Sequence, residues 1–168
     1  GSTRYPGKPL AMLDGVPMIQ RVYDACIASK LPTYVLTDDQ RIANVFQNTS
    51  VIIDDKDYDN GTERCAGAIG LDYMQKYDQF INVQGDMPDV TLQMIEKCIS
   101  SLQHYPVSTV FTEMPEEKQN NPNSVKMVRA GDSALWFGRG MTGYGDWHLG
   151  VYGYRKNALQ CYPNLQVE

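Results

Sequence analysis

Several marks of other protein classes are missing from this sequence of 168 residues. Its four cysteines are far apart and form no C-x-x-C pair, which argues against a zinc site. No apolar run approaches the ~20 residues that a membrane-spanning helix needs. The formal net charge is −5, so the chain offers no basic excess for binding nucleic acid or a membrane surface. The spacing of a Walker A phosphate loop is also missing.

The composition indicates a globular chain. Hydrophobic residues make up 42% of it and charged residues 21%, which excludes a disordered chain. A chain of this length fits one domain with a real hydrophobic core. The cysteines are expected to be free thiols, three of them buried in helices, in a reducing compartment. This favours a cytoplasmic location, and no signal peptide is visible.

Strand-like and helix-like segments alternate as far as about Thr112. Short apolar or β-branched runs predict strands at 33–37, 51–53, 80–83 and 107–112. Apolar residues at helical spacing, or a capping residue at the start, predict helices at 17–29, 39–47, 61–75 and 91–102. This alternation predicts an α/β fold, a Rossmann-like and mostly parallel sheet with helices on both faces.

The pattern changes after about Glu113. Two strand-like runs, 125–129 and 134–137, flank Gly131-Asp132 and predict a hairpin, with a further strand at 149–154. The polar stretch 116–123 is expected to be a loop. This part predicts an antiparallel extension on the core sheet.

The opening run, GSTRYPGKPL, combines small residues with the two cations Arg4 and Lys8. Exposed backbone N–H groups and fixed cations both bind anions, so such a loop suits a polyphosphate. The alternative is an ordinary basic surface loop. A doubly wound sheet normally has a hydrophobic strand ahead of its phosphate loop. Either the natural chain is longer or this strand has been lost. We expect a trimmed chain, because an unfilled central strand position would leave the edges of two strands unpaired.

A second motif, NVQGDMP at 82–88, follows a predicted strand. It places Asp86 at the sheet edge where open α/β folds bind ligands. One carboxylate suits Mg²⁺, whose other ligands are phosphate oxygens and water. Gly85 lets the backbone approach a substrate. The alternative is a simple turn, since Gly-Asp and x-Pro are turn formers.

Four further motifs carry candidate residues. NGTER at 60–64 opens a helix whose N–H groups favour anions or polar bases, or it is only a capped helix start. In TDDQRI at 37–42, capping by Asp39 is the favoured interpretation. Arg139, in ALWFGR, offers a guanidinium, which can bind a carboxylate through two hydrogen bonds. His148, in HLGVYGYR, is either a hydrogen-bonding ligand residue or structural, and Tyr152 shares one strand face with Tyr154.

Together these motifs resemble, in order and over nearly the whole chain, those of the 3-deoxy-manno-octulosonate cytidylyltransferases (CMP-Kdo synthetases). These sugar nucleotidylyltransferases carry S-T-R-x-P-G-K-P-L, T-D-D-E-R, S-G-T-[DE]-R, V-Q-G-D-E-P, N-P-N-x-V-K, A-L-Y-F-S-R and H-x-G-[IV]-Y-x-Y-R. This chain has Asn60, Met87 and Gly138 where the family has Ser, Glu and Ser, and it departs further after Arg139.

The resemblance implies that CTP and Kdo, or a closely related acidic sugar, give a CMP-sugar and pyrophosphate with Mg²⁺ as cofactor. It assigns Arg4 and Lys8 to the triphosphate and Asp86 to the metal. It places near the nucleotide Ser2, Gly7, Asn60, Gly61, Thr62 and Arg64. It places at the sugar Gln84, Arg139, His148 and Tyr152. It also implies a cytoplasmic homodimer that serves lipopolysaccharide or capsule biosynthesis.

The expected organisation is a single nucleotidyltransferase domain over 1–168. It lacks the family's first strand and its C-terminal segment, which carries a second acidic metal ligand. Two alternatives remain open. One is another sugar nucleotidylyltransferase, such as a CMP-sialate synthetase or an enzyme for an aminated Kdo analogue. The other is a truncated, non-catalytic nucleotide-binding module.

Overall fold

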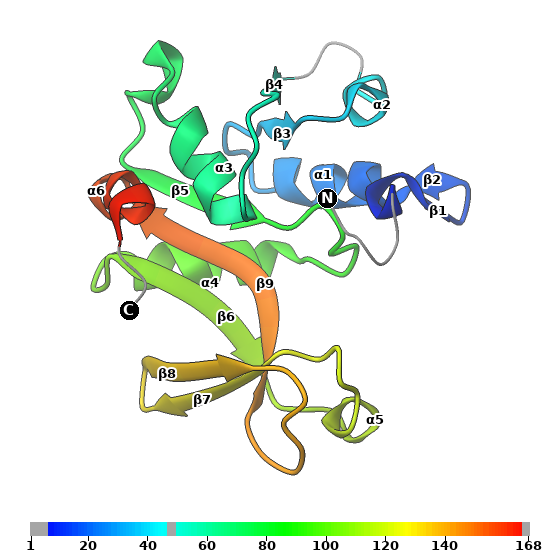
Figure 1. Cartoon of the computed structure of the whole chain (residues 1–168), viewed down its shortest axis with the longest axis vertical. Coiled ribbons are helices and arrows are strands. Elements are labelled where there is room, and N and C mark those ends of the chain that lie inside the picture. The colour runs from blue at the N-terminus through cyan, green and yellow to red at the C-terminus, as the bar shows by residue number, and fades with distance from the viewer. Residues whose placement is uncertain (1–6, 47–49, 166–168) are drawn as a thin grey trace. The chain divides into compact units, whose positions relative to one another are not determined.

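A computed structural model describes residues 7–46 and 50–165 (Figure 1). The chain forms two compact units. The main unit comprises Gly1–Ser108 and Val151–Glu168, and the insert unit comprises Thr109–Gly150. Each is described here by itself.

The described part of the main unit contains, near its start, a short hairpin that the sequence patterns did not predict. The 3₁₀ helix η1 (Lys8–Leu10) leads to the strands β1 (Met12–Leu13) and β2 (Val16–Pro17), which pair antiparallel. Asp14 and Gly15 join them with φ angles of 47° and 80°, as a two-residue turn of the hairpin type requires. Helix α1 (Met18–Ile27) follows and confirms the predicted helix.

The next strands form the parallel pair that the alternating pattern predicts. Strand β3 (Val35–Thr37) pairs in parallel with β4 (Val51–Ile53). Between them, α2 (Gln40–Ala43) is capped by Asp39, whose side chain accepts a hydrogen bond from the backbone N–H of Arg41. The predicted capping is confirmed, but the helix is shorter than expected.

Helix α3 (Gly61–Ala68) covers only the first part of the helix predicted over 61–75. Gly70 separates it from the 3₁₀ turn η2 (Asp72–Met74), and glycine commonly ends helices. The strand β5 (Gln79–Val83) and the helix α4 (Leu92–Ser101) come next, close to their predicted bounds. Both α3 and α4 contact β5, and Figure 1 shows them above and below it.

The pairing of β5 corrects the expected mostly parallel sheet. Along its whole length β5 pairs antiparallel with β9 (Asp146–Arg155), with Phe80 opposite Tyr154. The chain comes back along β9 and occupies one edge of β5. Strand β6 (Val107–Thr112) also pairs with β9. The fold is therefore mixed α/β with small, partly antiparallel sheets.

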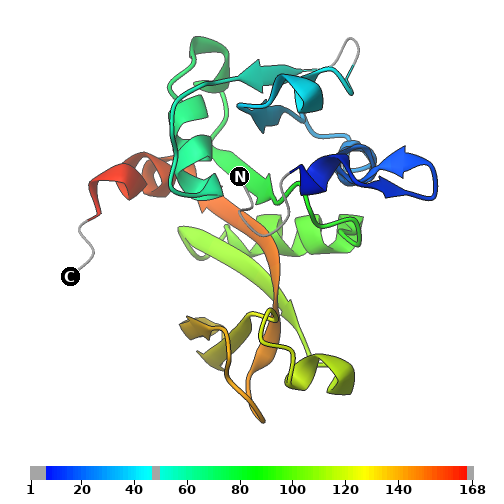
Figure 2. The same ribbon diagram turned by 45° about the vertical axis from the view of Figure 1, so that its right-hand side comes forward.

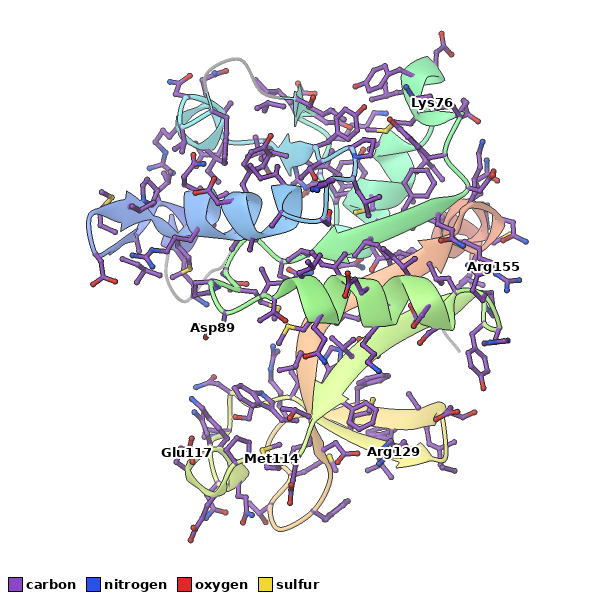
Figure 3. The ribbon with its side chains drawn as sticks, turned by 180° about the vertical axis from the view of Figure 1, so that it is seen from behind. Lys76, Asp89, Met114, Glu117, Arg129 and Arg155 are labelled. Atoms are coloured by element: carbon purple, nitrogen blue, oxygen red, sulfur yellow. The ribbon has the colours of Figure 1, made fainter. Side chains whose placement is uncertain are left out.

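The end of β9 is anchored by its last residue. Arg155 donates hydrogen bonds to the backbone carbonyls of Leu102 and Gln103, which follow α4 (Figure 3). The helix α6 (Lys156–Cys161) and the 3₁₀ turn η3 (Tyr162–Asn164) then close the described chain. The core of the main unit holds two buried clusters, around Ile19, Val35 and Phe46, and around Ile69, Tyr154 and Leu159.

The insert unit contains the predicted hairpin. Strands β7 (Lys126–Ala130) and β8 (Ser133–Gly138) pair antiparallel, and β7 also pairs with the first residues of β9 (Figure 2). Gly131 turns the hairpin with a φ of 58°. The polar stretch expected to be a loop holds one short helix, α5 (Glu116–Gln119).

The cysteines are free thiols, as the sequence predicts. Only Cys98 is buried; Cys26 and Cys65 are half-buried and Cys161 is exposed, so the expected burial of three thiols is wrong for two of them. Burial raises the pKa of the Cys65 thiol to about 12 and that of Cys98 to about 11.

Candidate functional site

The carboxyl ends of β3 and β5 bring the first candidate residues together. Both strands run in the same direction in Figure 1. Asp38 follows β3, and Gln84 and Gly85 follow β5; all three line a cavity of about 520 Å³ in the main unit. Ligands of open α/β sheets bind outside the carboxyl ends of the strands, so this is the expected location of a site.

An ion pair joins the opening run of the chain to the loop after β5. The ammonium Nζ of Lys8 lies 2.7 Å from Oδ2 of Asp86, and the two side chains are 39% and 40% exposed. Gly7, with a φ of 74°, precedes η1 and allows the turn that brings Lys8 to this position. Two residues far apart in the sequence thus meet at one point. The other predicted residues of this run, Ser2 and Arg4, lie outside the described residues.

The start of α3 forms one wall of the cavity. A Cβ atom added at Gly61 would lie 3.0 Å from Nε2 of Gln84, so glycine gives this amide its space. Asn60 caps the helix, and its side-chain oxygen accepts from the N–H groups of Thr62 and Glu63. The Thr62 hydroxyl lies 2.9 Å from the Tyr154 hydroxyl. Asn60 and Thr62 therefore have clear structural partners, while Gly61 and Gln84 face the cavity.

Arg64 reaches the cavity from the second turn of α3. One terminal nitrogen, Nη2, donates to Oδ2 of Asp38 at 2.8 Å, and the guanidinium lies over the Tyr58 ring at 5.3 Å. This contact holds the pKa of the Asp38 carboxyl below its usual value. The other nitrogen, Nη1, is buried and has no hydrogen-bond partner among the described residues. It is a donor available to a ligand. The sequence analysis missed Asp38 and Tyr58 as its neighbours.

Asn82 is a second donor that sequence reasoning missed. It lies on β5 and lines the cavity, and its Nδ2 is buried without a hydrogen-bond partner in the described part of the chain. Buried polar groups in folded proteins are nearly always paired, so an unpaired one needs an explanation. The available signal was an amide within the otherwise apolar run 80–83.

The donor set at Asp86 fits a magnesium ion bound together with a polyphosphate. Residues 7–46 and 50–165 contain no group of three His, Cys, Asp or Glu side chains that could hold a metal alone. Mg²⁺ needs only one or two protein carboxylates when substrate phosphates supply the other ligands. Asp86 meets that condition because its carboxylate is partly exposed beside the cation Lys8.

The residues predicted to face a sugar fall in both units. Gln84 and Tyr152 belong to the main unit, where the Tyr152 ring stacks on Tyr154 at 6.4 Å between centroids. Arg139 and His148 belong to the insert unit, and Arg139 is exposed just after β8.

His148 is held firmly within the insert unit. Its side chain is buried, with Nε2 2.9 Å from the Thr109 hydroxyl and its ring 4.9 Å from that of Phe137. Burial lowers the pKa of His148 to about 4. The imidazole is therefore neutral at physiological pH.

In the described part of the chain, no helix is long and apolar enough to cross a membrane. The chain resembles known proteins over its full length. It is 38% identical over 185 residues to the 8-amino-3,8-dideoxy-manno-octulosonate cytidylyltransferase of Shewanella halifaxensis. The alignment covers 99% of this chain and 76% of that enzyme. The enzyme of the same name from Shewanella frigidimarina is 37% identical with the same coverage. These alignments are longer than the chain, so the relatives hold extra residues within the matched region.

A solved structure agrees with these relatives. The CMP:2-keto-3-deoxy-manno-octonic acid synthetase complexed with CTP superposes with a TM-score of 0.85 at 30% identity, covering 100% of this chain and 75% of that one. The family model for cytidylyltransferases matches residues 1–166. On this evidence, together with the site at the ends of β3 and β5, the chain belongs to the cytidylyltransferase family.

Proposed function

We propose that the protein transfers CMP from CTP to a Kdo-type sugar acid and releases pyrophosphate. The observation that carries this proposal is the meeting of Lys8 and Asp86 beside the cavity, a cation and a carboxylate within 2.7 Å. The relatives' names add the sugar class. Because the two relatives are 38% and 37% identical, the 8-amino sugar is the first acceptor to test, ahead of Kdo itself.

The chemistry needs positioning and charge neutralisation more than covalent catalysis. The anomeric hydroxyl of the sugar attacks the α-phosphate of CTP in line, and pyrophosphate leaves. Lys8 binds the triphosphate and stabilises the charge that develops on the leaving pyrophosphate. Arg4 is proposed to share this task. Mg²⁺, when bound by Asp86 and the phosphates, supplies further neutralisation of phosphate charge.

The two unpaired donors of the cavity suit the base of the nucleotide. Cytosine offers a carbonyl oxygen and a ring nitrogen as acceptors, and Arg64 Nη1 and Asn82 Nδ2 each lack an acceptor among the described residues. Both residues line the same cavity as Gly61. Pairing them with the base satisfies both donors, which is the reason we assign this wall to the nucleotide.

We assign the sugar to Gln84, Arg139, His148 and Tyr152. Arg139 offers a guanidinium for the sugar carboxylate. His148 offers a neutral imidazole, since its pKa is lowered to about 4. A reaction that consumes CTP, together with free thiols, supports a cytoplasmic location for this step of cell-envelope biosynthesis.

A second copy of the chain is proposed to cover β8. Leu135, Trp136 and Phe137 are 64%, 62% and 44% exposed, and β8 lies at the end of its strand order. An exposed edge strand with large apolar side chains favours pairing with another chain. Light scattering of the Trp136→Glu variant tests this: a dimer that becomes a monomer supports the proposal, and an unchanged mass contradicts it.

An additional strand is proposed to fit between β3 and β5 in a complete nucleotidyltransferase domain. In the described residues β3 pairs with β4 and β5 with β9, which leaves each with one unpaired edge. Residues 34–38 and 79–85 of these strands line the same cavity. A parallel strand there would fill its apolar part and satisfy both edges.

Pyrophosphate release from CTP and Mg²⁺ tests the function. The assay compares Kdo, 8-amino-Kdo, sialic acid and no sugar, with EDTA as a control. Release that requires a Kdo-type sugar and stops with EDTA is expected. Release with sialic acid alone, or CTP binding without release for any sugar, would instead favour the sialate-type enzyme or a non-catalytic module.

A further inference from the structure

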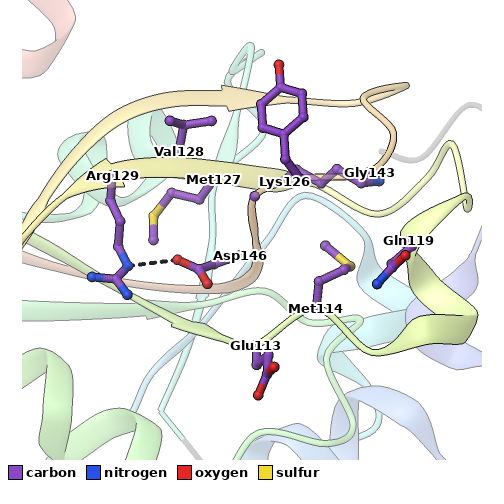
Figure 4. A pocket seen from close by; sticks show the side chains of 11 residues that line it. Glu113, Met114, Gln119, Lys126, Met127, Val128, Arg129, Gly143 and Asp146 are labelled. Carbon is purple, nitrogen blue, oxygen red and sulfur yellow. Dashed lines mark hydrogen bonds and ion pairs between the residues drawn. The ribbon is translucent and has the colours of Figure 1, made fainter.

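The insert unit contains a pocket of its own. It has a volume of about 510 Å³ and lies between β7, the segment before β9 and the chain that leads into α5 (Figure 4). Its polar lining includes Glu113, Gln119, Lys126, Arg129 and Asp146. None of the sugar-side residues proposed above lines it.

Lys126 is the unusual member of this lining. Its side chain is only 1% exposed, although lysine is almost never fully buried without a partner. Its ammonium Nζ has no hydrogen-bond partner among the described residues. An ammonium group carries three donors and no acceptor, so it needs a hydrogen-bond acceptor, and an anionic oxygen also neutralises its charge. A buried charge without such a partner is strongly unfavourable, which indicates that the partner comes from outside the described residues.

The acidic residues of the pocket do not fill this role. The Asp146 carboxylate is engaged by Arg129, whose Nε lies 2.7 Å from Oδ2 of Asp146. Glu113 is exposed and points away from Lys126 in Figure 4. The positive charge of Lys126 is therefore not neutralised within the pocket.

The segment after β8 lies directly on Lys126. A Cβ atom added at Gly145 would lie 3.2 Å from Cβ of Lys126, and Gly145 has a φ of 96°. Gly143, two residues earlier, has a φ of 80°. Both conformations favour glycine, and at Gly145 the lack of a side chain lets the backbone approach the base of the lysine. The backbone at Gly145 therefore packs closely against Lys126 at the wall of the pocket.

We infer that this pocket holds an oxyanion subsite in which Lys126 binds a carboxylate or phosphate oxygen. The ammonium supplies the charge, and the Gln119 amide at the end of α5 supplies a further polar group of the lining. A sugar carboxylate and a phosphate group present the same chemistry. Because the proposed function assigns the carboxylate of the acceptor sugar to Arg139, outside this lining, the subsite takes a second oxyanion, and the sugar-acid and phosphate arms of the test identify it.

The test compares the wild-type protein with the Lys126→Met variant, in which the side chain keeps a similar length and loses its charge. Lys118→Met is the matched control, because Lys118 belongs to the same unit but lies over the Trp147 ring, outside the pocket lining. Calorimetry measures binding of Kdo, of 8-amino-Kdo and of inorganic phosphate, each with and without CMP and at fixed ionic strength. Thermal unfolding of each variant is measured without ligand.

For Lys126→Met we expect anion binding to weaken by about 30-fold or more, as truncating a buried charge contact does. CTP binding should stay unchanged, and the ligand-free variant should unfold at no lower temperature, because a buried unpaired charge is gone. If Lys126→Met loses the binding of inorganic phosphate but still binds both sugars, the result supports the subsite and identifies phosphate as its anion. Equal binding by the wild type and Lys126→Met, or no anion binding by the wild type, overturns the inference.

The same experiment separates this inference from the proposed function. Normal pyrophosphate release with equal anion binding by the wild type and Lys126→Met would overturn the subsite and leave the function standing. Lys126-dependent binding without pyrophosphate release for any sugar would support the subsite and contradict the function.

Discussion

Replacing Lys8 by methionine should separate catalysis from stability. The change keeps the length of the side chain and removes one charge of the Lys8–Asp86 pair. Because the two side chains are 39% and 40% exposed, solvent screens their attraction. Exposed ion pairs contribute roughly 0.2–1 kcal/mol. We therefore expect the free energy of unfolding to fall by at most about 1 kcal/mol, which lowers Tm by about 2–4 °C in a chain of this size.

The effect on activity should be far larger. In the proposed reaction Lys8 stabilises charge that develops only as pyrophosphate leaves. Removing one preorganised contact of this kind typically lowers kcat by about 10²–10³-fold. The expected result is thus a variant that folds nearly normally and releases pyrophosphate at least about 100-fold more slowly.

Continuous detection of pyrophosphate measures the rate, and urea unfolding measures the stability. Lys97→Met, on an exposed position of α4, is the control for loss of a lysine charge. Near-normal activity of Lys8→Met would refute the catalytic assignment. A stability loss of several kcal/mol would also refute the reasoning, since it would make Lys8 a structural residue.

Three further predictions follow from burial. Because the pKa of His148 is lowered from 6.5 to about 4, the unfolded chain binds a proton in this range that the folded chain does not. The free energy of unfolding should fall as the pH falls from about 6.5 to about 4, by at most about 1.4 kcal/mol per pH unit, and His148→Gln should flatten this slope in urea titrations. Iodoacetamide at pH 8, followed by mass spectrometry, should label the exposed Cys161 and spare Cys98, whose pKa is raised to about 11; equal labelling would contradict the packing. Gly153→Ala should destabilise the protein by roughly 1–3 kcal/mol, because the new Cβ would clash with the Ser108 hydroxyl oxygen; an unchanged urea midpoint would contradict this.

Local signals predicted most of the elements. Asn60 and Asp39 were recognisable as caps because a short polar side chain before a helix satisfies its first N–H groups. The Gly131-Asp132 pair marked the hairpin because glycine accepts the positive φ that the turn requires. These features depend on residues close together in the sequence.

The features that the sequence did not reveal depend on distant contacts. Nothing in the apolar run of β5 specifies whether its neighbour is parallel or, as found, the antiparallel β9. The unpaired donors of Arg64, Asn82 and Lys126 become apparent only once burial and neighbours are known. The motif around Lys126 carried the family resemblance, but a lysine in a sequence is ordinarily an exposed residue.

The most direct test of the account is pyrophosphate release by this chain from CTP and Mg²⁺, with 8-amino-Kdo or Kdo as acceptor. The account predicts release that depends on the sugar, stops with EDTA and falls at least about 100-fold in Lys8→Met. Folded protein that binds CTP and releases no pyrophosphate with either sugar would contradict it.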